Sequence, residues 1–109
     1  MRDDRLYLIH IREAIERIEE YTRAGEIGFR EDHKTQDAVL RNLHTLSEST
    51  QRLSQVIKDQ NPNVDWRSIA AFRNIIVHDY LGVDIDQIWD IVQDDLPGLK
   101  HAVVMLLAK

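Results

Sequence analysis

The sequence predicts an all-α fold, an antiparallel bundle of four helices whose last helix is split. Four successive segments repeat apolar residues with the period of a helix, and no segment of useful length alternates like a strand. Glycine or proline lies between these segments, as expected at helix ends. The 109 residues are predicted to form one domain, residues 1–109, with a modest core.

The first predicted helix carries one apolar stripe and ends where Gly25 and Gly28 interrupt it. Because residues three, seven and ten positions apart share a helix face, the stripe is expected to face the core. It consists of Leu8, Ile11, Ile15 and Ile18.

The second predicted helix is the longest and ends at the sequence Asn61, Pro62, Asn63. Proline disfavours helical geometry in the residue before it, so the helix cannot continue through this tripeptide. The stripe of this helix comprises Val39, Leu43, Leu46, Leu53 and Ile57.

The third predicted helix begins after Asp65, whose side chain can cap it, and is expected to end at Gly82. Ile69, Phe72 and Ile76 recur at helical spacing, so we expect them to face the core.

The last predicted helix begins at Asp84 as a cap and is interrupted between Asp95 and Pro97. Proline is favoured in the first turn of a helix, which predicts a break followed by a second helix start. The apolar positions of the two parts are Ile85, Ile88, Trp89, Val92, Leu96, Leu99, Val103 and Leu106.

Composition favours a cytoplasmic globular protein, with 43% hydrophobic and 30% charged residues. Charged residues interrupt the first five positions, so no signal peptide is predicted, and no stretch is long and apolar enough to span a membrane. The absence of cysteine excludes disulfides and thiolate metal sites. A net charge of −5 argues against unspecific nucleic-acid binding, so any contact with RNA requires a local patch.

The sequence predicts neither a metal site nor a cofactor. No two of its five histidines have the i, i+4 spacing that would place two metal ligands on one helix turn. Pairs of aspartates at predicted helix starts lack the other ligands of a calcium loop, and no glycine-rich phosphate loop is present. Four histidines are scattered and are interpreted as surface or helix-end residues: His10, His33, His44 and His101.

The octapeptide RNIIVHDY at positions 73–80 places several polar residues on the third predicted helix, at the border of the core. Arg73 and Tyr80 point in nearly the same direction on a helix, Asn74 and His78 form the adjacent row, and about 140° of rotation separates Arg73 from His78. One interpretation is structural: Arg73 pairs with Asp79 or a neighbouring acid, and the histidine benefits from the helix dipole.

A second interpretation of the octapeptide is chemical. Arginine offers a fork of donors that matches a phosphate, and histidine exchanges a proton near neutral pH. Together they suffice for metal-free cleavage of RNA through the ribose 2′-hydroxyl. One histidine cannot easily serve as both acid and base in one pass, which favours two protomers facing a shared cleft.

The segment "VDWRSIAAFRNIIVHDYLGVD", followed by "IWDIVQDDLP" and preceded by the helix "TQDAVLRNLHTLSESTQRLSQ", resembles HEPN domains over nearly the whole chain. It is most similar to the HepT branch, the toxins of HepT/MntA toxin–antitoxin pairs. The resemblance implies a homodimeric helical bundle that acts as a metal-independent endoribonuclease on RNA.

Four residues receive roles from this resemblance. Arg73 and His78 match the catalytic pair, and Asn74 matches the polar position that orients the histidine or the scissile phosphate. Tyr80 matches the tyrosine that an MNT-type nucleotidyltransferase antitoxin modifies with AMP, which inhibits the toxin. Two alternatives stay open on the residues alone: a non-catalytic module that binds a nucleotide or the partner, and a structural helical adaptor.

Overall fold

The computed structural model describes residues 2–77 and 85–109, and every regular element in these ranges is helical, which confirms the predicted all-α class. The elements are α1 (Arg2–Tyr21), α2 (Glu26–Glu31), α3 (His33–Arg52), α4 (Gln55–Asp59), α5 (Trp66–Ala70), α6 (Phe72–Val77), α7 (Ile85–Asp90), the π-helical turn η2 (Ile91–Asp95) and α8 (Leu96–Leu107).

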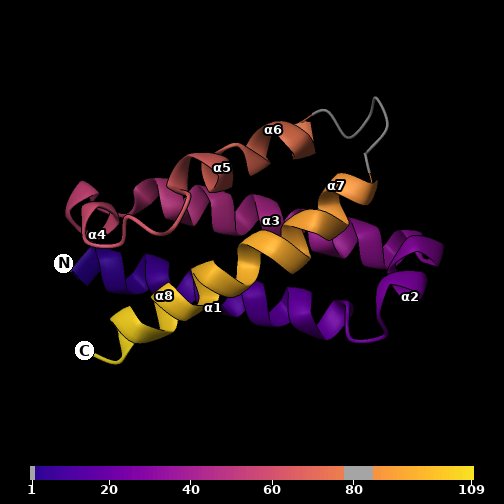
Figure 1. Ribbon diagram of the computed structural model, residues 1–109, viewed down its shortest axis with the longest axis horizontal. Helices are drawn as coiled ribbons and strands as arrows, with labels where there is room; N and C mark the ends of the chain where they lie inside the picture. Colours follow the sequence, from indigo (N-terminus) through magenta and orange to yellow (C-terminus); the bar gives the residue numbers. More distant parts are fainter. Residues whose placement is uncertain (1, 78–84) are drawn as a thin grey trace.

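The long helices run antiparallel (Figure 1). The chain passes along α1, returns along α3, reverses again through α5 and α6, and returns a last time through α7, η2 and α8. Helix α1 packs against α3 and α8, and α3 also packs against α5 and α6. Helix α3 therefore lies between the first helix and the segment that carries Arg73.

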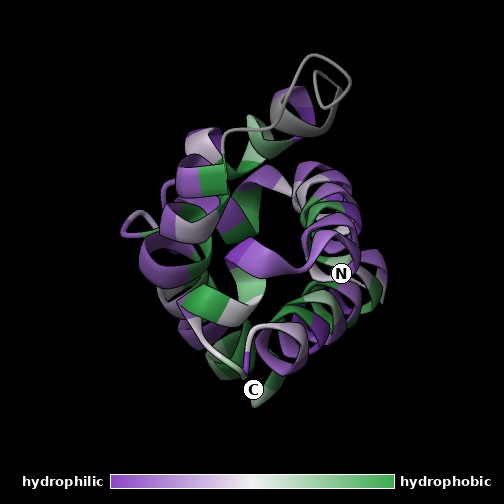
Figure 2. Ribbon diagram, turned by 90° about the vertical axis from the view of Figure 1, so that its right-hand side faces the viewer, coloured by the Kyte–Doolittle hydropathy of each residue, from purple (hydrophilic) through white to green (hydrophobic). Residues whose placement is uncertain are grey.

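The predicted apolar stripes form the core. Seen along the bundle, the hydrophobic residues turn inward and the hydrophilic residues cover the outside (Figure 2). Burying one such aliphatic side chain stabilises the fold by about 1.5–3 kcal/mol relative to exposing it. The most completely buried side chains from the predicted stripes are Ile11, Ile15, Ile18, Val39, Leu43, Leu46, Ile88, Leu99 and Val103.

The first helix ends earlier than the glycines suggested. Helix α1 stops at Tyr21, and Gly25 adopts a φ of 93°, in the left-handed region that favours glycine. Gly28 is not a helix end, because it lies within the short helix α2. The buried ring of Phe29 anchors α2 to the core and to Trp89, with 5.3 Å between ring centroids. Helix α2 was not predicted, because both glycines were interpreted as one helix boundary.

The predicted second helix is two helices, because the chain breaks at Leu53 and Ser54. The Ser54 hydroxyl accepts a hydrogen bond from the Ile57 backbone N–H at 3.3 Å, which caps α4. The Ser54 backbone N–H donates a hydrogen bond to Asp4 Oδ1 at 2.8 Å. It therefore does not donate to the carbonyl four residues earlier, as a continuous helix would require. Leu53 and Ile57 are still buried, as predicted. The prediction of one long helix was wrong, because the Asp4 side chain on α1 accepts the hydrogen bond of the Ser54 N–H that a continuous helix would need.

The third predicted helix is also interrupted, at Ala71 between α5 and α6. Its predicted cap is confirmed: Asp65 accepts hydrogen bonds from the Ser68 backbone N–H at 3.1 Å and the Ser68 hydroxyl at 2.8 Å. Hydrogen bonding from Ser68 holds the pKa of Asp65 below its usual value. Ile69 and Phe72 are buried as expected. The predicted helix end at Gly82 and the predicted cap Asp84 lie outside the described residues.

The predicted break near Pro97 is a change of helix type and not an interruption. The chain stays helical through the π-helical turn η2, where the Leu96 backbone N–H bonds to the Ile91 carbonyl. Proline lacks an N–H and its ring crowds the preceding turn, and a widened turn accommodates both effects. Pro97 lies in the first turn of α8, as predicted.

Within the two described ranges, no helix is long and apolar enough to cross a membrane.

Candidate functional site

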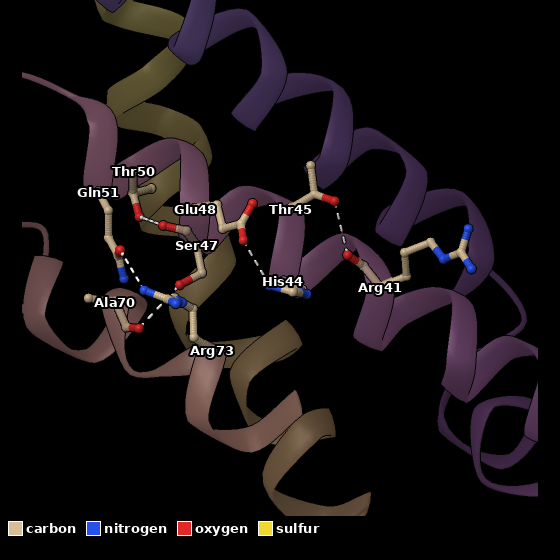
Figure 3. A network of polar contacts seen from close by, with 9 residues as sticks. All are labelled: Arg41, His44, Thr45, Ser47, Glu48, Thr50, Gln51, Ala70 and Arg73. Atoms are coloured by element: carbon tan, nitrogen blue, oxygen red, sulfur yellow. Dashed lines mark hydrogen bonds and ion pairs between the residues drawn. The ribbon is translucent and has the colours of Figure 1, made fainter. Parts of the chain in front are cut away.

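Arg73 lies in the first turn of α6, beside the C-terminal end of α3. Its Nη1 donates a hydrogen bond to Gln51 Oε1 at 3.0 Å, and both side chains are exposed (Figure 3). Among the described residues, Arg73 forms no ion pair with a carboxylate. The structural alternative named Asp79 as partner, and that residue lies outside the described ranges. The observed partner is neutral, so the positive charge of Arg73 is not compensated by it.

Buried hydrogen bonds fix the backbone just before Arg73. The Ser47 hydroxyl, which is completely buried, donates to the Ala70 carbonyl at 3.2 Å. Thr50 is buried beside it and donates through its hydroxyl to the Ser47 carbonyl at 2.8 Å (Figure 3). Because Ala70 and Arg73 are three residues apart, this tie to α3 sets the position from which the arginine projects.

A shallow groove of about 390 Å³ opens beside Arg73. Arginine and amide side chains supply most of its polar groups, and these groups are suited to bind an anion. The groove brings Arg73 and Asn74 together, so two of the four predicted site residues share one surface. Its lining consists of Gln51, Arg67, Ala70, Ala71, Arg73 and Asn74.

His78 and Tyr80 lie outside the described residues, and their roles stay predictions. Helix α6 reaches Val77, directly before His78 in the sequence. The described part of the site therefore contains Arg73 and Asn74, and the other two predicted site residues lie outside it.

Sequence reasoning missed Gln51, the partner of Arg73. No local signal marks this glutamine, because it is one of several polar residues on α3 and its partner lies on α6. His44 was interpreted as a surface histidine, and the structure places it on the surface, where its Nε2 is 3.0 Å from Glu48 Oε1. His44, Glu48 and Gln51 are spaced along one side of α3 (Figure 3).

An acidic hollow lies apart from the arginine groove, between the loop before α5 and the start of α8. Burial raises the pKa of Asp95, and the neighbouring charges of Asp94 and Asp65 raise it further. No group of three potential metal ligands occurs within residues 2–77 and 85–109. The two hollows therefore carry opposite charge.

Comparison of the sequence with known proteins shows the family to which the chain belongs. The family described as HepT-like, "Ribonuclease HepT-like", matches residues 11–106. The "Probable ribonuclease HepT" of Thermococcus cleftensis is 42% identical over 97 residues, which cover 86% of this chain and 86% of that protein. A "Putative RNase" of Methanocaldococcus jannaschii is 30% identical over 103 residues, with 94% of each chain covered.

A second protein of Methanocaldococcus jannaschii, "Gamma-glutamylcyclotransferase and putative RNase", is 34% identical over 107 residues. The match covers 97% of this chain and 48% of that protein, so this chain corresponds to about half of it. No solved structure matches the chain significantly.

Proposed function

The chain belongs to the HepT-like ribonuclease family, and on that premise we propose that it is a metal-independent endoribonuclease acting as the toxin of a HepT/MntA-type pair. One observation carries the proposal. Arg73 is exposed at a groove beside Asn74, and its guanidinium is held by the neutral amide of Gln51. Because this partner is neutral and Arg73 pairs with no carboxylate among residues 2–77 and 85–109, we infer that its guanidinium can bind a phosphate.

In the proposed reaction, His78 takes the proton of a ribose 2′-hydroxyl and the 2′-oxygen attacks the adjacent phosphorus. The bond from phosphorus to the 5′-oxygen breaks, and that oxygen leaves as a hydroxyl after it gains a proton. Arg73 stabilises the negative charge that develops on the phosphate oxygens, and Asn74 orients the histidine or the phosphate. The products are a 2′,3′-cyclic phosphate and a 5′-hydroxyl end.

The proposed assembly is a homodimer that faces two copies of this surface toward one cleft. Two histidines would then supply the base and the acid of one cleavage event. The proposed regulator is a separate MNT-type nucleotidyltransferase that attaches AMP to the Tyr80 hydroxyl. The added phosphate would pair with Arg73, and the added nucleoside would fill the groove, so charge and volume together would exclude RNA.

The decisive experiment incubates the purified chain with RNA in the presence of EDTA. We expect cleavage that the chelator does not inhibit, with cyclic phosphate and 5′-hydroxyl ends. Arg73→Ala and His78→Ala should each lower the cleavage rate by about 100-fold or more and keep the wild-type helical circular dichroism. Metal-dependent cleavage leaving 5′-phosphates would contradict the mechanism. RNA binding without cleavage by the wild type would favour a non-catalytic binding module.

Two further measurements test assembly and regulation. Light scattering should give a dimer, and a 12.8 kDa particle at micromolar concentration would contradict the shared cleft. Incubation with ATP and an MNT-type nucleotidyltransferase should add AMP to Tyr80, which peptide mass spectrometry can locate. Tyr80→Phe should escape this inhibition. AMP on a different residue, or full inhibition of the phenylalanine variant, would leave Tyr80 with a packing role only.

A further inference from the structure

A second groove lies next to the groove beside Arg73, along α4 and α5. The two grooves share Arg67 and Ala70 in their linings, so they are neighbours on this side of the molecule. We call these two adjacent grooves the basic track. Its second part is lined by Gln55, Lys58, Asp59, Pro62, Trp66, Arg67 and Ala70.

The basic track gathers cations on an acidic protein. Arg73, Arg67 and Lys58 line it, with Asp59 as the one carboxylate among its described lining residues. Asp59 accepts a hydrogen bond from the Gln55 amide at 2.9 Å. Since the whole chain carries a net charge of −5, a phosphate chain can bind only where cations gather in this way.

The cationic side chains of the track form no ion pairs within the described part of the chain. Arg30 pairs with Glu26 and Asp86, and Lys100 pairs with Glu19, whereas Lys58 and Arg67 form no such pair among the described residues. The charge of Arg67 does act on Asp65, but the carboxylate oxygens of Asp65 already accept from Ser68. As far as the described ranges show, Lys58 and Arg67 can thus exchange water for phosphate oxygens.

Trp66 adds an aromatic surface to the track. Its indole N–H donates to the Asn61 carbonyl at 3.0 Å, which fixes the ring, and the side chain is partly buried against the core. A fixed aromatic ring in a cationic groove is the arrangement on which bases of single-stranded nucleic acid stack. Bases in a duplex are stacked on each other and cannot use such a ring.

We propose that the basic track binds single-stranded RNA and leads it to Arg73. Arg67 and Lys58 bind successive phosphates, and one base stacks on Trp66. Arg67 and Arg73 line the same groove, so a strand that contacts Arg67 lies beside Arg73. This inference rests on the proposed ribonuclease function, and it assigns the substrate as an unpaired strand that enters from the α4 end.

Binding to a 2′-O-methylated single-stranded oligoribonucleotide tests the track separately from catalysis. Such a strand has no free 2′-hydroxyl and cannot be cleaved by the proposed reaction. Arg67→Gln and Lys58→Gln should each weaken binding by about 3- to 10-fold in fluorescence anisotropy. Each should also lower the slope of log K against log salt by about 0.7, the value for one phosphate contact on a single strand.

The matched control is Arg17→Gln, which removes the same charge from an exposed position on α1. Helix α1 lies on the other side of α3 from α5 (Figure 1), so this variant should bind like the wild type. Trp66→Phe should keep most of the affinity, and Trp66→Leu should lose about tenfold without a change in salt slope, because stacking is not ionic.

Two results would overturn the track. One is equal affinity for Arg67→Gln, Lys58→Gln and Arg17→Gln, and the other is a duplex of the same sequence binding as tightly as the single strand. If Trp66→Leu does not fold, the affinities of the Arg67→Gln and Lys58→Gln variants still test whether the track binds RNA. Cleavage of ordinary RNA by the wild type and by both charge variants at equal rates would reject the track and retain the ribonuclease. Charge-dependent binding without any cleavage would support the track and reject the ribonuclease.

Discussion

Two polar contacts join distant parts of the chain near the C-terminal end of α3, and they differ in their exposure. Asp4 on α1 accepts from the Ser54 backbone N–H at 2.8 Å, and Asp4 is only 4% exposed. Arg73 on α6 donates to Gln51 at 3.0 Å, and both residues are exposed. The first contact is removed from water and holds two helices together, whereas the second lies at the surface, where Gln51 is the one hydrogen-bond partner of the Arg73 side chain among the described residues.

The difference in burial predicts that the Asp4 contact contributes to stability and that Arg73 is available for function. Removing the acceptor from a buried N–H costs stability because no water replaces it. An exposed arginine that loses its partner regains water, so the same kind of deletion costs little. We therefore expect changes at Asp4 to appear in unfolding and changes at Arg73 to appear in RNA cleavage.

The largest expected effect is on catalysis at Arg73. Arg73→Ala should lower the cleavage rate by about 100-fold or more, because it removes a charge aimed at the transition state. Its free energy of unfolding in urea should stay within about 0.5 kcal/mol of wild type, as for an exposed residue. A variant that loses stability and activity in parallel would make Arg73 a structural residue and remove the contrast with Asp4.

The next effect concerns stability at Asp4. Asp4→Ala should lower the free energy of unfolding by about 2 kcal/mol, because the Ser54 N–H loses a charged acceptor in a buried place. Asp3→Ala is the matched control, since Asp3 lies in the same first turn of α1 and is exposed. Urea unfolding measures both variants. Equal losses for Asp3 and Asp4 would assign the effect to the helix dipole.

A smaller effect is expected at Gln51. Two substitutions there distinguish the positioning of Arg73 from the charge of its partner. Gln51→Ala removes the neutral partner of Arg73 and should lower cleavage by roughly 2- to 5-fold through looser positioning. Gln51→Glu keeps a partner but places a carboxylate against the guanidinium, where it competes with phosphate and should lower cleavage about tenfold. Steady-state rates at low RNA concentration measure both. A glutamate variant as active as wild type would show that a neutral partner is not required.

The smallest effect is the pH dependence of the Asp4 contact. Burial raises the pKa of Asp4, but hydrogen bonding from Ser54 outweighs it, and the folded pKa lies below its usual value. A lowered folded pKa adds stability that is complete above the unfolded pKa of about 3.9 and is lost as pH falls through the folded pKa. The difference in unfolding free energy between wild type and Asp4→Asn should therefore shrink below about pH 4.

Urea unfolding at several pH values measures this difference, and other carboxylates common to both proteins cancel from it. A difference that stays constant from pH 6 to pH 3 would mean that Asp4 is not ionised in the contact.

Features that depend on residues close together in the sequence were predicted correctly, and features that depend on residues far apart in the sequence were not. The helix faces through Ile11, Leu43 and Val103 were predictable because periodicity along one segment decides which side avoids water. The Asp65 cap was predictable because its partner, Ser68, is three residues away. The break at Ser54 was not predictable, since its cause is a carboxylate 50 residues earlier.

The sequence by itself determined the all-α class, the core-facing stripes and the position of Arg73 and Asn74 beside each other on one helix, because these depend on helical period and neighbouring residues. Only the tertiary structure decided that Gln51 holds Arg73 and that Lys58, Trp66 and Arg67 line the adjacent groove. These residues come from separate helices, and a surface between helices exists only after their apolar faces have packed against each other.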